Sequence, residues 1–439
     1  MTTGLASARR WTCALSGLLF SLVVLLVTAE RASGQTESTD GKSLLEEAAS
    51  ALDREEGLSP DTRKALTSLL RSLSTDVEAA AEPSPWERAL DRLTFYGDFR
   101  YRHESSFKLD GQKDRHRERL RVRLGVNYLP ADELLLGFRM VTGDRKDPAS
   151  PHVTLGDGFD DLEVSLDRAF VRYEPGWAEG VSATAGKFDH PFFRNPVYGE
   201  LVWDADIQPE GVALRWEDGV GPLERTSLTL GVYTVLEEAS TDDVFILTGE
   251  WAGRAKLGEK EELSFGIGYA SYTDPTPDGS RTLLAENAGN RLADRDGDGT
   301  ADDFFSDFGI LNPVVAVRSN RLAKPVLVSG ELIRNARGRG GEDTGWALGA
   351  SVGGTQRKGD WRTYYQFQVV EQDAVFSPFA QDDFVLRTNH RSHVFGAGYQ
   401  ITDRVGLHLW GLVSERLERN PGQSDQHQWR GRLDLNIKF

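Results

Sequence analysis

Apolar and polar residues alternate along the last seven residues of the chain. Leu433, Leu435, Ile437 and Phe439 are apolar, and the residues between them are polar or charged. Successive side chains of a strand point to opposite faces, so this segment predicts a strand with one apolar and one polar face. The same period of two begins at Leu93 and recurs up to this end of the chain.

The first two runs after Leu93 show that the polar face must meet water. In residues 95–101, Phe, Gly, Phe and Tyr occupy the odd positions, and Tyr96, Asp98 and Arg100 lie between them. The second run places Arg117, Arg119, Arg121 and Arg123 in register, opposite Leu, Val and Tyr. Four arginines in register fit neither lipid nor the core of a soluble β-sandwich, so they must face a water-filled lumen.

Sixteen runs of this kind can be counted between Leu93 and the end of the chain. Their approximate centres are Phe99, Leu124, Phe138, Ala169, Ala183, Ala213, Leu230, Gly249, Gly266, Val315, Gly330, Gly349, Phe367, Phe395, Leu409 and Leu435. Links after even-numbered runs are short and turn-like, whereas most links after odd-numbered runs are long, polar and acidic. Short periplasmic turns and long outer loops alternate in this way in outer-membrane barrels. We therefore expect an all-β protein, a transmembrane antiparallel β-barrel of about 16 strands over residues 91–439.

The first 90 residues follow other patterns. Residues 1–34 combine Arg9 and Arg10 with an apolar stretch and small residues, which predicts a signal peptide. Residues 35–90 place leucines at helical spacing before a Pro-rich break, which predicts a short N-terminal α-helical extension and a linker. An even strand number leaves both barrel ends on the periplasmic side, so we expect this extension in the periplasm. A helical hairpin, a loosely ordered segment and a short coiled coil that assists oligomerisation or contacts the cell wall remain open.

Charge and cysteine content narrow the function further. The formal net charge is -17, which argues against a nucleic-acid partner, although the acidic excess lies largely in loops and the lumen can be locally positive. The single cysteine, Cys13, lies in the predicted signal peptide. Its removal would leave no disulfide, thiolate metal site or cysteine nucleophile.

Several segments resemble the "putative porin" family of bacterial outer-membrane barrels. They are Leu166–Tyr173, Ala185–Phe188, Trp203–Asp206 and Pro209–Ala213, together with the terminal Phe439. The resemblance spans roughly residues 93–439 and implies a channel in the outer membrane without naming a solute. It implies contact with outer-membrane lipid, small hydrophilic solutes and the barrel-assembly machinery. A homotrimer is expected on fold analogy alone.

Two sets of charged residues are candidates for the pore. The basic set is expected to form one wall of the lumen: Arg100, Arg102, Arg117, Arg119, Arg121, Arg123 and Arg139. The acidic set lies in the link from about Phe188 to Glu210, which in general porins folds into the lumen: Asp189, Glu200, Asp204 and Asp206. A basic wall opposite an acidic constriction loop would create a transverse field that orients solutes and filters ions. Alternatively, the arginines solvate the lumen or pair with carboxylates on adjacent strands.

An acidic segment in the long fifth outer loop matches a calcium loop in part. Its candidate ligands are Asp294, Asp296, Asp298, Thr300, Asp302 and Asp303. Gly299 follows the third of them at the position where a calcium loop needs its tight turn, but Phe305 stands where a bidentate Glu is usual. We expect a structural Ca²⁺ in this loop and no other cofactor, with a flexible acidic loop as the alternative.

No combination of residues predicts an enzyme. His390, Ser392 and His393 lie together on one run, and their alternation is expected to keep His and Ser on different walls. The function that we predict is an outer-membrane porin, a passive diffusion channel for small hydrophilic solutes or ions with an arginine-lined lumen. The alternatives are an envelope tether or adhesion barrel with a closed lumen and, more remotely, a barrel hydrolase.

Overall fold

The computed structural model divides the chain into two units, residues 1–90 and 91–439. The structure describes residues 64, 67–68, 71, 89–107, 113–143, 149–199, 201–237, 243–273, 275, 282–295, 297–383, 386–419, 423 and 426–439. The six described residues of the first unit are helical. The predicted signal peptide and nearly all of the predicted extension and linker lie outside the described residues.

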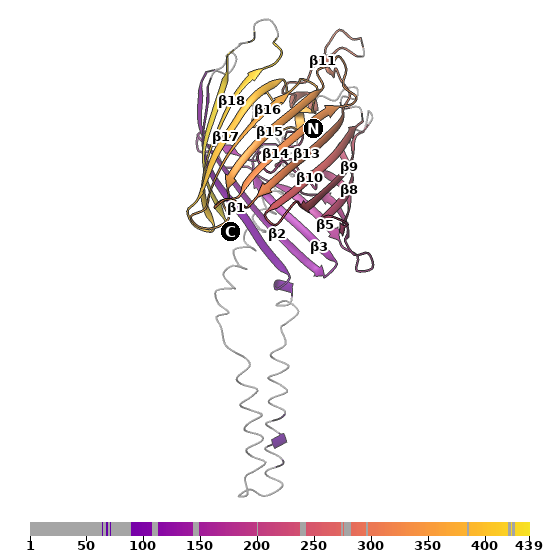
Figure 1. Cartoon of the computed structure of the whole chain (residues 1–439), viewed down its shortest axis with the longest axis vertical. Coiled ribbons are helices and arrows are strands. Elements are labelled where there is room, and N and C mark those ends of the chain that lie inside the picture. The colour runs from indigo at the N-terminus through magenta and orange to yellow at the C-terminus, as the bar shows by residue number, and fades with distance from the viewer. Residues whose placement is uncertain are drawn as a thin grey trace, which may run out of the picture. The chain divides into compact units, whose positions relative to one another are not determined.

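Sixteen antiparallel strands form the second unit. They are β1 (Leu93–Phe107), β2 (Arg115–Ala131), β3 (Leu134–Thr142), β5 (Val164–Tyr173), β6 (Val181–Lys187), β7 (Glu210–Val220), β8 (Leu223–Leu236), β9 (Val244–Lys256), β10 (Glu261–Tyr272), β13 (Gly309–Ser319), β14 (Val326–Asn335), β15 (Thr344–Gly353), β16 (Trp361–Val370), β17 (His390–Gln400), β18 (Val405–Arg416) and β19 (Gln428–Lys438). Each strand pairs with its neighbour along the chain, and β1 pairs with β19 to close the barrel (Figure 1). Every predicted centre falls within one of these strands, so the predicted barrel is confirmed.

The connections alternate between the two rims of the barrel, and those at one rim are at least as long as any at the other. The long loops are L1 (108–114), L2 (143–163), L3 (188–209), L4 (237–243), L5 (273–308), L6 (336–343), L7 (371–389) and L8 (417–427). The short turns gather at the other rim, where the C-terminus also lies (Figure 1). Short elements within the long loops are β4 (Val153–Thr154), α5 (Thr282–Ala285), β11 (Leu292–Ala293), β12 (Asp303–Phe304) and the 3-10 turn η1 (Ser377–Phe379).

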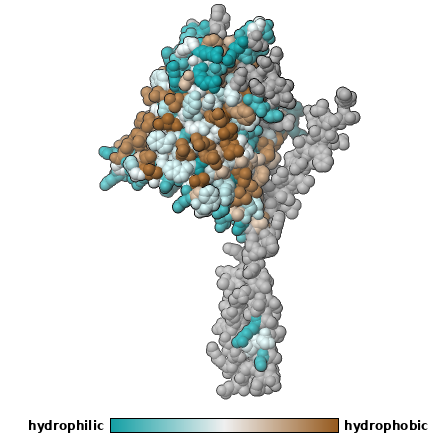
Figure 2. All heavy atoms as spheres, turned by 90° about the vertical axis from the view of Figure 1, so that its right-hand side faces the viewer, coloured by the Kyte–Doolittle hydropathy of each residue, from teal (hydrophilic) through white to brown (hydrophobic). Residues whose placement is uncertain are grey.

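The barrel is polar inside and apolar outside, as alternation along each strand requires. Leu214 and Leu332 are 52% and 61% exposed on the outer face, whereas Glu104 and Gln366 are fully buried on the inner face. Apolar side chains form a band across the face seen in Figure 2. Such a band is suited to lipid, and the polar interior is suited to water. Among the described residues, no helix is long and apolar enough to cross a membrane, which has no bearing on strands.

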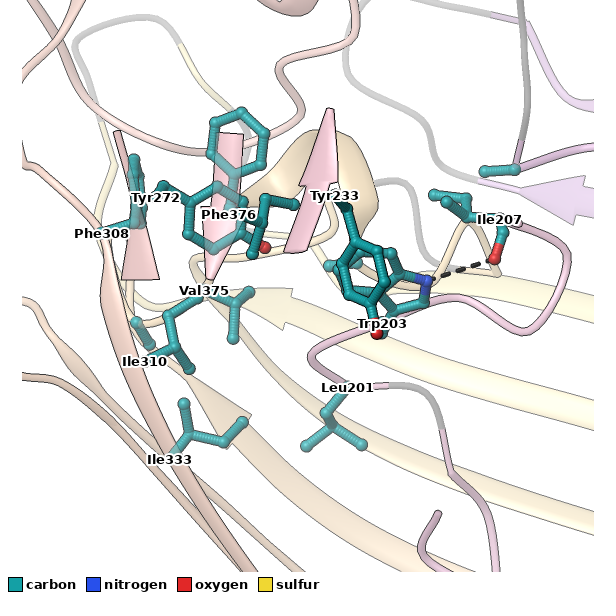
Figure 3. Packing of buried hydrophobic residues seen from close by; sticks show 14 of the residues in the cluster. Leu201, Trp203, Ile207, Tyr233, Tyr272, Phe308, Ile310, Ile333, Val375 and Phe376 are labelled. Carbon is teal, nitrogen blue, oxygen red and sulfur yellow. Dashed lines mark hydrogen bonds between the residues drawn. The ribbon is translucent and has the colours of Figure 1, made fainter. Parts of the chain in front are cut away.

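An apolar core lies inside the barrel, where L3, L5 and L7 pack together. Trp203 of L3 packs beside Tyr233, and Phe308 of L5 lies 5.1 Å from Phe376 of L7, measured between ring centroids (Figure 3). Buried Asp373 of L7 accepts hydrogen bonds from the Arg291 amide at 3.0 Å and the Ser306 hydroxyl at 2.7 Å, both in L5. Folded loops therefore occupy part of the interior near the long-loop rim, which the alternation of residues did not predict.

Candidate functional site

The predicted arginines lie on the lumen face of β1, β2 and β3, where carboxylates of adjacent strands accompany them. Glu104, fully buried on β1, accepts hydrogen bonds from Arg117 at 2.7 Å and from Arg432 of β19 at 2.6 Å. A third guanidinium, that of Arg119, lies 3.9 Å from the same carboxylate. The Arg119 side chain also donates to the Ser150 hydroxyl of L2 at 2.7 Å. One buried acid thus lies close to three arginine side chains.

A second acid of β1, Asp98, accepts hydrogen bonds from Arg121 at 2.7 Å and from Arg123 at 2.6 Å. Asp206 of L3 approaches the same two arginines, at 3.8 Å and 3.3 Å respectively. L3 therefore touches the arginine wall directly at this point instead of facing it across water.

Cross-strand pairing continues on both sides of these groups. Arg102 donates to Asp434 of β19 through Nε at 2.8 Å and Nη2 at 2.9 Å, the bidentate geometry that guanidinium and carboxylate favour. Arg100 lies 3.8 Å from the same carboxylate, and Arg139 of β3 donates to Asp167 of β5 at 3.0 Å. Carboxylates on the neighbouring strands therefore neutralise much of the arginine wall.

The tip of L3 crosses the lumen to the opposite wall. Asn195 donates to Glu331 of β14 at 3.1 Å, and the Phe193 amide donates to Glu250 of β9 at 2.9 Å. Arg362 of β16 donates to the carbonyl oxygen of Val197 at 2.7 Å. These contacts fix L3 within the barrel interior.

Three of the four predicted acids of L3 lie in the described part of the chain, and these three do not act together. Asp189 pairs with Arg168 at 2.9 Å, and buried Asp204 accepts the amides of Asp206 and Asp382 at 2.7 and 3.0 Å. Glu200 lies outside the described residues. Of the described three, only Asp206 reaches the predicted arginine wall.

An acidic pair in L7, which the sequence did not single out, also meets the lumen arginines. Asp383 pairs with Arg432 and accepts a hydrogen bond from Tyr198 of L3, and Arg430 donates to the Asp383 carbonyl at 2.7 Å. Burial alone would raise the pKa of the Asp383 carboxyl, but Arg432 and Arg102 outweigh it and lower the pKa. Burial and the charge of Asp383 raise the pKa of neighbouring Asp382. L7 thus supplies a charged anchor between L3 and β19.

Next to the short-turn rim, a cavity of about 710 Å³ opens in the lumen. Its lining includes four of the predicted arginines, Arg100, Arg121, Arg123 and Arg139. Arg362, Arg404 and Lys438 from the other side of the closure add three cations that the sequence reasoning missed. The only sequence feature that could have indicated these three cations is their position on a polar strand face or in a turn. We call this cavity the vestibule.

The predicted calcium loop uses several of its carboxylates for backbone hydrogen bonds. Asp294 accepts the amides of Gly297 at 2.7 Å and Gly299 at 2.9 Å, and Asp298 accepts the amide of Thr300 at 2.7 Å. Asp296 lies outside the described residues. Within the part of the chain that the structure describes, no three His, Cys, Asp or Glu side chains gather around a common metal position. Calcium binding at Asp294, Asp298, Thr300, Asp302 and Asp303 stays a prediction.

The expectation that His and Ser of β17 occupy different walls is wrong for one pair. His390 and Ser392 are two positions apart and share the lumen face, where Nδ1 and Oγ lie 2.8 Å apart. Both residues are buried, and Ser392 also contacts Ser414 at 2.9 Å. His393 lies on the outer face with Tyr365 at 2.7 Å. Burial leaves the Ser392 hydroxyl no access to a substrate.

Glycines in the wall beneath L3 yield a testable prediction. A Cβ at Gly349 would lie 2.8 Å from Val197 Cγ1, and one at Gly266 would lie 2.6 Å from Phe193 Cβ. We expect Gly349→Leu or Gly266→Leu to displace the L3 tip toward the lumen and lower single-channel conductance by a factor of roughly two. Gly431→Leu is the control, because its Cβ would meet nothing within 4 Å. Equal conductance in all three variants would contradict the role of these glycines.

Known proteins similar to this chain include one family and several solved structures. A family model described as "Putative porin" matches residues 108–305 and 315–439. No curated protein sequence matches the chain.

Solved porin structures are similar to this chain at low sequence identity. Pseudomonas putida OprB is 13% identical, with a TM-score of 0.52 over 80% of this chain and 96% of that one. Salmonella typhi OmpF in complex with daunomycin is 12% identical, with a TM-score of 0.49 over 79% and 97%. An anion-selective porin from Comamonas acidovorans is 11% identical, with a TM-score of 0.47 over 79% and 99%. The similarity to OprB supports the barrel fold alone.

Proposed function

This chain belongs to the "Putative porin" family, and on that premise we propose that it is a passive diffusion channel whose arginine-lined lumen selects small hydrophilic solutes and ions by size and charge. Family and fold together indicate a porin-like channel of the outer membrane. They favour a channel over an enzyme.

The observation that carries the proposal is a closed barrel with an ionic lumen, into which L3 folds together with L5 and L7. An inner face of buried charges would be costly unless water reached it or partners neutralised it. L3 narrows this interior by crossing from the β2 arginines to β14 and β16. Passage is then limited by the width beside L3 and by the charge of the wall.

Single-channel conductance of the refolded full chain in a planar bilayer, under a salt gradient, tests the proposal. We expect stable open steps with a preference for anions, because cations outnumber carboxylates in the vestibule. Arg100→Gln and Arg123→Gln should each reduce that preference, since both side chains are partly exposed in the lumen. Arg225→Gln, which removes an exposed arginine paired with Glu217, should leave it unchanged. A folded barrel without conductance would contradict the porin and favour the tether.

Four finer parts of the proposal come from the sequence. Residues 35–90 are proposed to lie in the periplasm, since the start of β1 and the end of β19 both lie at the short-turn rim. The barrel-assembly machinery and two further copies of the chain, in a trimer, are proposed partners on fold analogy. A structural Ca²⁺ is proposed for L5 on the acidic spacing of residues 294–303.

A further inference from the structure

The vestibule is built from two groups of strands that meet at the closure of the barrel. Arg100, Arg121 and Arg123 line it from β1 and β2, and Arg362 lines it from β16. Arg404 in the turn before β18 adds a cation at the rim. Side chains more than 200 residues apart in the sequence therefore surround one space.

Positive charge is in excess around this space. Seven cationic side chains line it, and Asp98 is the one carboxylate among its described lining residues. Three more acids lie within ion-pair distance of the lining cations without lining the cavity themselves: Asp206, Asp167 and Asp434. Seven cations then face four carboxylates, and Asp434 is already engaged in a bidentate pair with Arg102. The surplus among these side chains is three positive charges.

Arg362, Arg404 and Lys438 supply the surplus, because no carboxylate lies within ion-pair distance of them among the residues that the structure describes. Arg362 Nη2 donates to the carbonyl oxygens of Pro196 at 2.9 Å and Val197 at 2.7 Å. Its guanidinium stands 5.0 Å from the Tyr364 ring centroid. These contacts hold the guanidinium plane in place and use the hydrogen atoms of only one of its three nitrogens.

The Tyr364 hydroxyl lies 3.1 Å from Nε2 of His408, and both residues line the vestibule. Arg100 Nε donates to the neutral side chain of Asn436 at 2.6 Å. The vestibule thus presents neutral hydrogen-bonding groups beside its cations. A volume of about 710 Å³ is of the size that small-molecule sites have.

We infer that the vestibule is a binding site for small polyvalent oxyanions, such as inorganic phosphate or a dicarboxylate, on their path through the channel. The inference rests on the proposed function and adds a substrate class to it. A ligand with two negative charges offsets most of the surplus in one binding event, whereas two monovalent ions would have to bind together to do the same. Guanidinium groups suit such ligands because their donors match paired oxygens.

The test measures block of the chloride current through the full-length channel by inorganic phosphate, at a pH where the dianion predominates. We expect the current to fall with phosphate concentration and to level off, as it does when a site saturates. Succinate should act in the same way, and acetate, with one charge, should not. Arg404→Gln with Lys438→Gln should raise the half-blocking phosphate concentration about tenfold or more, the effect of losing charged hydrogen bonds.

Arg357→Gln with Lys358→Gln is the matched control, because it also removes two exposed cations from a turn of the same rim without changing the vestibule lining. An equal effect of this control would mean that general surface charge causes the block, and would overturn the site. Absence of block in a conducting channel would also overturn it. Calorimetric titration of the folded protein in detergent with phosphate separates the two proposals. Binding without conductance would keep the site and reject the porin, whereas conductance without binding would do the reverse.

Discussion

Glu104→Gln is expected to lower the free energy of unfolding of the barrel by about 3–5 kcal/mol. The Glu104 carboxylate is fully buried and bonded to Arg117 and Arg432, with Arg119 at 3.9 Å. Removal of this charge takes away the carboxylate that Arg117 and Arg119 share and leaves Arg432 with Asp383 alone. Urea unfolding of the refolded barrel in detergent micelles, followed by tryptophan fluorescence, measures the difference.

Glu224→Gln is the control for that experiment. Glu224 pairs with Lys256 on the outer side of the rim, where both side chains are exposed, so its loss should change the free energy of unfolding far less than Glu104→Gln does. Glu104→Asp keeps the charge and should fall between the two variants. Equal stability of Glu104→Gln and Glu224→Gln would show that water, rather than Glu104, compensates the three arginines.

Deletion of the L3 tip, residues 193–199, is expected to raise single-channel conductance roughly twofold or more and to shift selectivity toward cations. Conductance should rise because the tip crosses the lumen to β14 and β16. Selectivity should shift because Glu250 loses the Phe193 amide and Glu331 loses Asn195, so both carboxylates face water. Bilayer recordings under a salt gradient measure both quantities at once.

Two added substitutions separate these effects. In the deletion background, Glu250→Gln with Glu331→Gln should restore the original ion preference while conductance stays high. Circular dichroism should show that the β-structure persists in each variant. Unchanged conductance after the deletion would mean that L3 does not set the narrowest part of the pore.

The structure confirms how the sequence assigned inner and outer faces, but it changes the interpretation of the candidate site. Arg117 to Arg123 lie on the lumen face, as their spacing predicts, yet each has a partner that the spacing could not supply. The alternative that these arginines pair with carboxylates on adjacent strands describes most of the wall. The sequence predicts an acidic loop opposite these arginines. Among the described acids of that loop, only Asp206 reaches them, and it contacts the wall directly.

At β17, alternation along the strand predicts the faces that the structure shows. Residues two positions apart share a face, so His390 and Ser392 both face the lumen, whereas His393 faces outward. Applied consistently, the period of two was sufficient to place all three residues. Their burial, by contrast, depends on loops and on neighbouring strands.

The sequence by itself determined the strand number, the closed antiparallel architecture and the polarity of each face. These properties depend on the period of two and on link length, which are local along the chain. The tertiary structure decided which charges meet, since closure brings Arg102 to Asp434, 332 residues away. It also decided that L3, L5 and L7 build a core inside the barrel and that Arg362, Arg404 and Lys438 share the vestibule. Such contacts depend on register and on loop packing, which side-chain alternation does not encode.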